Sequence, residues 1–160
     1  MPSVPAPTKR SFWQRRLADP VRALFLQGVA PDRVALTFAI GTACSLLPFL
    51  GFTSLLNLGV GLWLRLNQPI LQTLNQLLGP VQLVLIIAYV RVGEKIWQAA
   101  PMPISVPLIT RAFKADPWAF LQRFGWTGVH AASAWALSVP LIIAGIYFPL
   151  RPLMRKFARR

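Results

Sequence analysis

The side chains that most often perform catalysis are few in this sequence and widely separated. Its four acidic residues all stand outside the long apolar segments: Asp19, Asp32, Glu94 and Asp116. His130 is the only histidine and Cys44 the only cysteine, which excludes a thiolate metal cluster and an internal disulfide. Acid–base and nucleophilic catalysis bring several such groups together. We therefore expect no enzymatic activity, no cofactor and no metal site.

His130 is the one ionisable side chain inside an apolar segment. Ionisable residues within a membrane often carry protons or line a polar path. His130 is therefore a candidate proton or hydrogen-bond site. The alternative is a neutral ring that is hydrogen-bonded between helices near the membrane interface.

Proline and glycine interrupt two long uncharged runs of the sequence, first at Pro48 and Gly51 and again at Gly79 and Pro80. A pair of interrupted apolar segments is the best sequence pointer to a transport site. Past each break a half-helix would begin inside the membrane, directing free amide donors and a positive dipole end to the same depth. Such a place favours an anion such as a lipid phosphate. Alternatively, the breaks only shape a compact bundle.

Polar and basic residues near these breaks complete the predicted ligand site. Thr53 and Ser54 would add hydroxyl groups after the first break, and Arg65 would balance a negative charge from the cytoplasmic side. The other candidates are Arg33, Asn67 and Asn75. Our first functional hypothesis is therefore a binder or translocator of an anionic amphiphile, such as a lipid phosphate.

The composition indicates which solvent surrounds these residues. Of 160 residues, 55% are hydrophobic, and the mean hydropathy of +0.53 does not suit a water-facing surface. Seventeen Lys and Arg give a formal net charge of +13, and they lie mostly outside the apolar runs. This pattern favours contact with anionic lipid head groups. It does not favour nucleic acid, which is usually read by an exposed basic face on a soluble fold.

The chain begins with two segments that lie outside the main apolar region. Residues 1–8 are rich in proline and predict a disordered tail. Residues 9–29 have apolar side chains at helical spacing with arginines elsewhere, which predicts an amphipathic helix in the head-group plane. A helix packed on the rest of the chain is the alternative.

Residues 30–150 form the predicted membrane domain, which begins with the uncharged run 34–64. As one straight helix this run would measure about 46 Å, longer than the ~30 Å hydrocarbon core. Each half is too short to span, so we predict a re-entrant helical hairpin that enters and leaves by the same face. Ala35, Ala39 and Ala43 recur every four residues and predict close helix packing.

Two later segments are long enough to cross a membrane. Residues 66–90 are uncharged but polar on one side, and we expect a span that is broken at its glycine and proline. Residues 124–150 carry aromatic residues near both ends, as an interfacial belt would, and form the clearest span. Between them, residues 91–123 predict an extramembrane loop, with a new helix start at Asp116–Pro117.

The distribution of basic residues predicts the orientation. Residues 151–160 bring five basic side chains and no acid, and form a basic cytoplasmic tail. A hairpin adds no net crossing and two spans add two, so both termini lie in the cytoplasm. This topology describes an all-α, multi-pass integral membrane protein. The sequence leaves open which side of the membrane holds the loop 91–123.

Several short motifs occur in an order that points to one protein family. They are Ala30-Pro31-Asp32-Arg33-Val34-Ala35-Leu36, Ala39-Ile40-Gly41, Leu47-Pro48, Gly51, Leu64-Arg65-Leu66-Asn67-Gln68-Pro69, Gly79-Pro80 and Tyr89-Val90-Arg91-Val92-Gly93. Over most of residues 28–150 the chain resembles the bacterial membrane family called domain of unknown function 2062. The resemblance implies a protein of the bacterial inner membrane. It implies no particular activity, although members fused to glycosyltransferases suggest envelope-lipid chemistry.

A second functional hypothesis comes from a different class of protein. The small-residue faces could dock other membrane proteins or a second copy of the chain, which would make the protein a scaffold without transport activity. The expected partners are therefore membrane lipids, most of them anionic, together with a homo-oligomer or other envelope proteins, and no nucleic acid.

Overall fold

The computed structural model describes residues 30–102, 111 and 114–158. The described elements are four helices: α2 (Pro31–Ser45), α3 (Phe52–Trp63), α4 (Gln68–Ile96) and α6 (Pro117–Ala158). The tail predicted at 1–8 and the amphipathic helix predicted at 9–29 lie outside the described residues. Within them, the all-helical class expected from the sequence is confirmed.

The helix starts follow from local capping chemistry. Asn67 precedes α4, and its side-chain oxygen accepts a hydrogen bond from the Ile70 amide at 3.1 Å. At the start of α6, Asp116 Oδ1 accepts bonds from the amides of Trp118 and Ala119, both at 3.0 Å. These oxygens satisfy amides that have no partner inside their helix. The helix start predicted at Asp116–Pro117 is confirmed.

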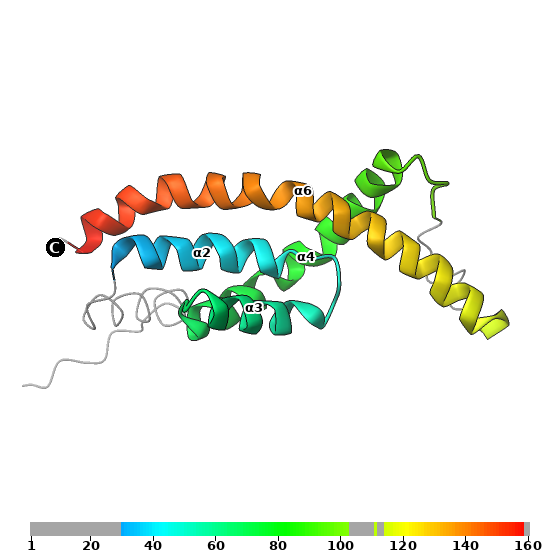
Figure 1. The fold of residues 1–160 in the computed structure, drawn as a ribbon, viewed down its shortest axis with the longest axis horizontal. Helices are drawn as coiled ribbons and strands as arrows, with labels where there is room; N and C mark the ends of the chain where they lie inside the picture. Colours follow the sequence, from blue (N-terminus) through cyan, green and yellow to red (C-terminus); the bar gives the residue numbers. More distant parts are fainter. Residues whose placement is uncertain (1–29, 103–110, 112–113, 159–160) are drawn as a thin grey trace, which may run out of the picture.

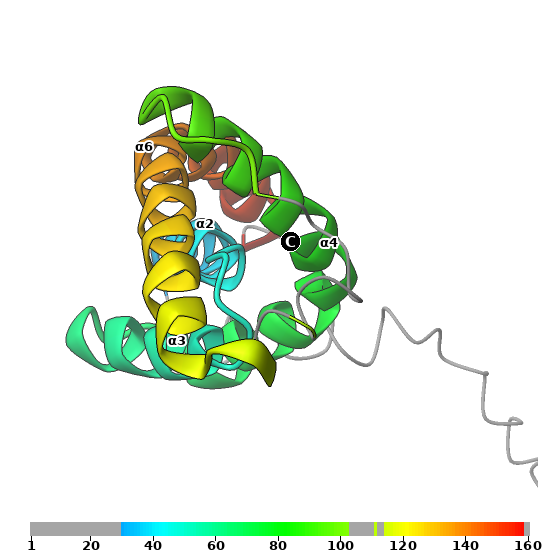
Figure 2. The same cartoon turned by 90° about the vertical axis from the view of Figure 1, so that its right-hand side faces the viewer.

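Helix α2 lies at the centre of the molecule and packs against all three other helices (Figure 2). Its small residues allow this close approach, because Ala35, Ala39 and Ala43 are each exposed by 1% or less. At Gly41 an added Cβ would lie 2.7 Å from a methyl carbon of Leu71 in α4. The small-residue face of α2 is thus buried by contacts with other helices of the chain.

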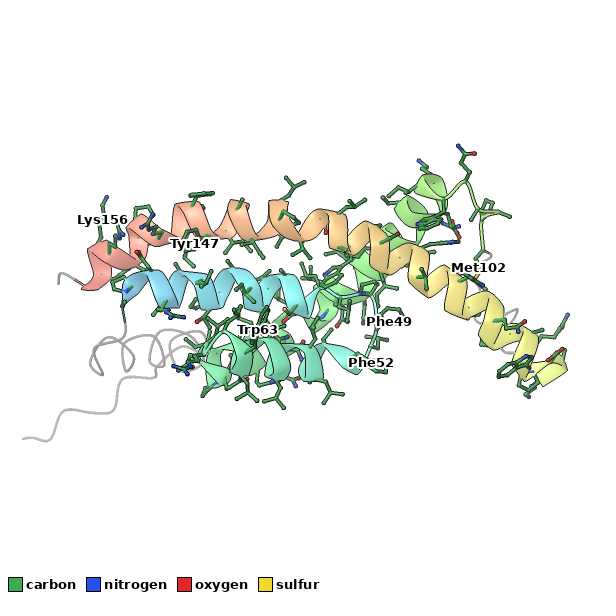
Figure 3. The ribbon with its side chains drawn as sticks, in the orientation of Figure 1. Phe49, Phe52, Trp63, Met102, Tyr147 and Lys156 are labelled. Atoms are coloured by element: carbon green, nitrogen blue, oxygen red, sulfur yellow. The ribbon has the colours of Figure 1, made fainter. Side chains whose placement is uncertain are left out.

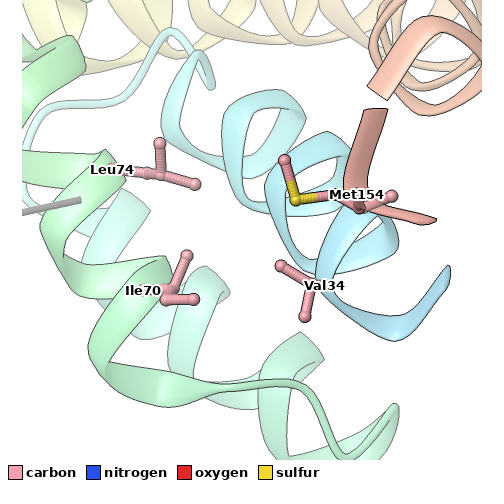
Figure 4. Packing of buried hydrophobic residues seen from close by; sticks show 5 residues of the cluster. Val34, Ile70, Leu74 and Met154 are labelled. Carbon is pink, nitrogen blue, oxygen red and sulfur yellow. The ribbon is translucent and has the colours of Figure 1, made fainter. Parts of the chain in front are cut away.

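Two further contacts fix the helices around α2. Val34, Ile70, Leu74 and Met154 converge from α2, α4 and α6 into one buried cluster (Figure 4). Helices α4 and α6 meet at Gly93, where an added Cβ would collide with the backbone of His130. Backbone atoms cannot move aside as a flexible side chain can, so only glycine fits this crossing.

Helices α2 and α3 form an antiparallel hairpin whose turn contains Pro48 and Gly51 (Figure 1). Gly51 has φ +87°, a left-handed backbone conformation that favours glycine. The helix–turn–helix predicted within 34–64 is therefore present. Residue 30, where the described chain begins, and the end of α6 lie at the same end of the molecule, opposite the turn (Figure 1).

The later segments differ from their predicted boundaries. Helix α4 continues without interruption through Gly79 and Pro80, so the break expected in 66–90 is absent. It also continues to Ile96, and α6 begins at Pro117, so the connection is shorter than the predicted loop 91–123. Helix α6 extends beyond the predicted span 124–150 at both ends and includes part of the predicted tail 151–160.

Helices α4 and α6 are both long and apolar enough to cross a membrane. With 29 and 42 residues, they measure roughly 43 and 63 Å at the usual rise. Of the most apolar 18-residue stretch in each, only 28% and 11% is buried inside the molecule. These two helices therefore leave most of their apolar surface uncovered by the rest of the described chain.

Candidate functional site

Neutral polar side chains line the contact between the hairpin and α4, and we call this set the polar seam. It consists of Ser45 from α2, Thr53, Ser54 and Asn57 from α3, and Gln68, Gln72, Asn75 and Gln82 from α4. No formally charged residue belongs to it. The polarity predicted for one side of 66–90 thus faces other parts of the protein.

Asn57 joins α2 to α3 inside the hairpin and is completely buried, with 0% exposure. Its Nδ2 donates to Ser45 Oγ at 3.1 Å and to the Thr53 carbonyl at 3.0 Å. Ser45 Oγ in turn donates to the Gly41 carbonyl at 2.6 Å. The amide nitrogen of Asn57 is therefore fully used, and its orientation is fixed by two acceptors.

Helix α4 donates to α3 through a second series of carboxamides. Asn75 Nδ2 donates to Ser54 Oγ at 2.8 Å, and Gln72 Nε2 donates to the Ser54 carbonyl at 3.3 Å. Nearer the start of α4, Gln68 Nε2 donates to the Leu58 carbonyl at 3.2 Å. These bonds fix the register of α3 on α4 in a region where few charged groups are present.

Three carboxamide oxygens of the seam have no hydrogen-bond partner among the described residues. They are Asn57 Oδ1, Gln68 Oε1 and Asn75 Oδ1. A buried acceptor without a donor destabilises a folded protein by about 1–3 kcal/mol. The unpaired side-chain groups of the seam are thus hydrogen-bond acceptors. The sequence predicts donors here, which would bind an anion.

Gln82 was not among the predicted site residues, yet it connects α4 to the hairpin turn. Its side chain is 4% exposed, and Nε2 donates to the Leu47 carbonyl at 2.8 Å. Trp135 of α6 donates to the Ala43 carbonyl at 2.9 Å. Trp135 satisfies a carbonyl in the last turn of α2 that the helix leaves unpaired, and Gln82 satisfies a carbonyl in the turn that follows α2. The sequence signal for Gln82 is its position on the polar side of the uncharged segment 66–90.

Charged side chains gather at the opposite end of the hairpin, and we call this group the basic end. It consists of Asp32, Arg33, Arg65, Arg151, Arg155 and Lys156. Asp32 receives paired bonds from Arg151, both at 3.1 Å, and from Arg155, at 2.9 and 2.7 Å. Hydrogen bonds from Arg155 and then Arg151 lower the pKa of Asp32 to about 2. This ion cluster joins the start of α2 to the end of α6.

The two predicted arginines meet at this end. Arg33 Nη1 donates to the Leu64 carbonyl at 3.0 Å, just past the end of α3. Arg65 follows that carbonyl directly, is exposed, and holds a positive φ of 53°. Next to it, Leu62 and Trp63 are 64% and 82% exposed. A cationic side chain therefore stands beside an uncovered apolar surface.

The structure divides the predicted ligand site into separate places. Pro48 and Gly51 lie at the hairpin turn, with Phe49 and Phe52, whereas Tyr147 and Lys156 lie toward the other end (Figure 3). The 12-residue helix α3 separates the turn from Arg65, a distance of roughly 18 Å. Arg65 and Gly51 therefore lie at opposite ends of α3, and the structure does not bring them together at one place.

The remaining predicted residues have structural roles or different neighbours. Asn67 caps α4. Gly79 and Pro80 lie inside α4, so they direct no helix N-terminus toward a ligand. Thr53 and Ser54 lie in the seam, with Asn75.

His130 belongs to α6 and lies at neither of these places. It is next to the C-terminal end of α4. Its ring stacks on Trp97, with 5.4 Å between ring centroids, and lies 6.5 Å from the ring of Trp126. Nearby, Glu94 accepts bonds from Arg91 at 2.9 Å and from the Met102 amide at 2.7 Å. Within the described residues, no three His, Cys, Asp or Glu side chains form a group that could hold a metal ion.

The described elements are all helices, and two of them are long and apolar enough to cross a membrane. The protein therefore belongs to the class of helical proteins with candidate membrane spans. Residues 14–159 match the family described as an uncharacterized protein conserved in bacteria, domain of unknown function 2062, and the chain belongs to this family. No curated protein and no solved structure matches the chain.

Proposed function

We propose that this protein is a multi-pass integral membrane protein in which α4 and α6 span the bilayer and α2–α3 form a re-entrant hairpin. The uncovered apolar surfaces of both long helices support this placement, because hydrocarbon can cover them. Trp126 and Tyr147 of α6 are 21 residues apart. At the usual rise they are separated by about 32 Å, close to the ~30 Å hydrocarbon thickness. At the turn, Gln82 of α4 donates to the Leu47 carbonyl and the ring of Phe49 lies against Gly128 of α6, whereas Leu50, Gly51 and Phe52 are exposed and would contact lipid.

The basic end faces the cytoplasm in this proposal, and the membrane is the bacterial inner membrane. Arg151 and Arg155 bind Asp32 at the start of α2, Lys156 lies in the last turn of α6, and Arg33 binds the carbonyl that precedes Arg65. Basic residues that flank membrane helices remain on the cytoplasmic side. Both termini are then cytoplasmic, and the connection between α4 and α6 lies on the outer side.

At the basic end the protein binds an anionic amphiphile, for which a phospholipid with an exposed phosphate is the simplest form. The observation that carries this function is the position of Arg65, exposed beside Leu62 and Trp63. A guanidinium can donate paired hydrogen bonds to phosphate oxygens. The acyl chain of the same ligand would lie along the apolar face of α3. Arg33, one bond of which is used by the Leu64 carbonyl, adds positive charge at the same place.

The test is a comparison of two lipids on the purified full-length protein. Native mass spectrometry in detergent would measure the affinity for phosphatidic acid and for phosphatidylcholine. Arg65→Asn removes the charge but keeps a residue type that tolerates positive φ. We expect about a tenfold preference for phosphatidic acid in the wild type and little preference in Arg65→Asn.

The matched control is Lys95→Gln, which removes one positive charge from the other end of α4. It should keep the preference for phosphatidic acid. An unchanged preference in Arg65→Asn, or an equal loss in both variants, would contradict a site at Arg65.

A further inference from the structure

The polar seam has a second property that anionic lipid binding at the basic end does not explain. Asn57 and Asn75 are each more than nine-tenths buried, with 0% and 8% exposure. Both have their amide nitrogens engaged, and among the described residues no group donates to either Oδ1. Two buried oxygens thus need a positive or hydrogen-bond-donating partner.

Helix register and one hydrogen bond bring these two oxygens into the same region. Ser54 and Asn57 are three residues apart on α3, which places their side chains on the same helix face. Ser54 Oγ accepts the 2.8 Å bond from Asn75 of α4. Ser45 Oγ accepts the 3.1 Å bond from Asn57 on the other side. Hydroxyl oxygens can accept a second interaction, so the seam offers up to four neutral oxygen ligands.

The end of α2 contributes partial negative charge to the seam, beside the partial positive charge at the start of α3. Ser45 is the last residue of α2, and the C-terminal end of a helix carries a partial negative charge. Asn57 is bonded to that residue. Helix C-terminal ends and neutral oxygens are also the groups that hold sodium ions inside transporters.

Among the described residues no carboxylate belongs to the seam, and this limits the charge of the ion. Asp32 is bound by two arginines at the basic end. Glu94 is 19 residues beyond Asn75 in α4, roughly 28 Å away along the helix. A divalent ion would keep most of its charge uncompensated in this position, whereas sodium and potassium ions bind neutral oxygens.

From these observations we propose that the seam between α2, α3 and α4 binds a monovalent metal cation through Asn57, Asn75 and the hydroxyls of Ser45 and Ser54. The proposal is independent of the lipid site, which lies at the other end of α3. The bound ion would lie between the hairpin and α4. It would either stabilise the fold or couple ion binding to transport. Water molecules that satisfy the same two oxygens are the competing occupant.

The experiment measures the thermal stability of the purified full-length protein in lithium, sodium, potassium and choline chloride at equal ionic strength. Binding of sodium-22 by a scintillation proximity assay provides a second readout. We expect at least one metal cation to raise the melting temperature above its value in choline, in a saturable manner. Choline is too large for a buried site and keeps the ionic strength equal.

Asn75→Leu removes one proposed ligand, and Gln76→Leu is its matched control on the exposed side of the same helix. Asn75→Leu should raise the half-saturating cation concentration about tenfold or more, and Gln76→Leu should leave it unchanged. The wild type decides the proposal even if Asn75→Leu does not fold. Identical melting temperatures in all four salts, without bound sodium-22, would show that no metal cation binds the seam and would overturn the proposal.

Discussion

The two places where proline and glycine interrupt the apolar sequence have opposite structures. At Pro48 and Gly51 the chain reverses direction between α2 and α3, whereas at Gly79 and Pro80 α4 continues as one helix. The same residue types therefore end a helix in one place and not in the other. The order and spacing of the two residue types differ, because Gly51 follows Pro48 by three residues whereas Gly79 directly precedes Pro80.

At the hairpin turn, contacts from elsewhere in the chain hold the open backbone. Gln82 donates to the Leu47 carbonyl, and the ring of Phe49 lies against Gly128 of α6. In α4, Pro80 removes one amide donor, yet helix continues on both sides and its ring is exposed. A proline inside a helix is tolerated in membranes when neighbouring groups satisfy the freed backbone. Tertiary contacts are thus present at the interruption that forms a turn, whereas the interruption inside α4 is exposed.

The largest expected effect comes from restoring the missing donor in α4. Pro80→Ala returns an amide to the helix and removes the clash of the ring with the preceding turn. We expect the free energy of unfolding to rise by about 3 kcal/mol. Unfolding in detergent micelles, followed by circular dichroism, measures it. A loss of stability would mean that the proline geometry is itself needed by the packing of α4.

The two glycines provide a sharper comparison of equal substitutions. An added Cβ meets nothing within 4 Å at Gly51 or at Gly79, so only the backbone conformation differs. Gly51→Ala places a side chain at φ +87° and should lower stability by about 1–2 kcal/mol. Gly79→Ala lies within a helix and should raise it by about 1 kcal/mol. The same unfolding assay tests both, and changes of equal sign would contradict the structure.

The smallest expected effect concerns the basic end, where ion pairs from Arg151 and Arg155 to Asp32 join the start of α2 to the end of α6. The pKa of Asp32 is about 2, below its ordinary value of 3.8. Its contribution to stability is therefore fully present above about pH 4 and is lost as the pH falls through 2. The melting temperature of the wild type should exceed that of Asp32→Asn at pH 6, and the difference should narrow toward pH 2. A difference that does not vary with pH would exclude this role for the carboxylate.

The fold was largely predictable because its signals are local and periodic. Apolar runs predicted the two long helices, and Asp116 predicted the start of α6 through its capping oxygen. The boundaries of α4 were missed because its last turns carry charged residues, Arg91, Glu94 and Lys95. Glu94 is nevertheless buried there, since Arg91 and the Met102 amide satisfy it. No local rule predicts that pairing.

The candidate site was less predictable, because residue type does not reveal the partner. Asn67 and Asn75 have the same side chain, but one caps a helix and the other reaches Ser54 on α3. Gln82 donates to the Leu47 carbonyl because α4 passes next to the hairpin turn at this residue. Such roles depend on which helices are neighbours, and single-sequence patterns do not contain that information.

By itself the sequence determined that the chain is helical and apolar, where charge accumulates, and where a tight turn could form. These properties follow from hydropathy, helical periodicity and backbone chemistry, which act over a few residues. Only the tertiary structure decided that one interruption turns and the other does not, and that Arg65 and Gly51 lie far apart. It also decided that the seam presents oxygens without donors. Those outcomes depend on contacts between distant segments, whose free energies are comparable to the local preferences that they override.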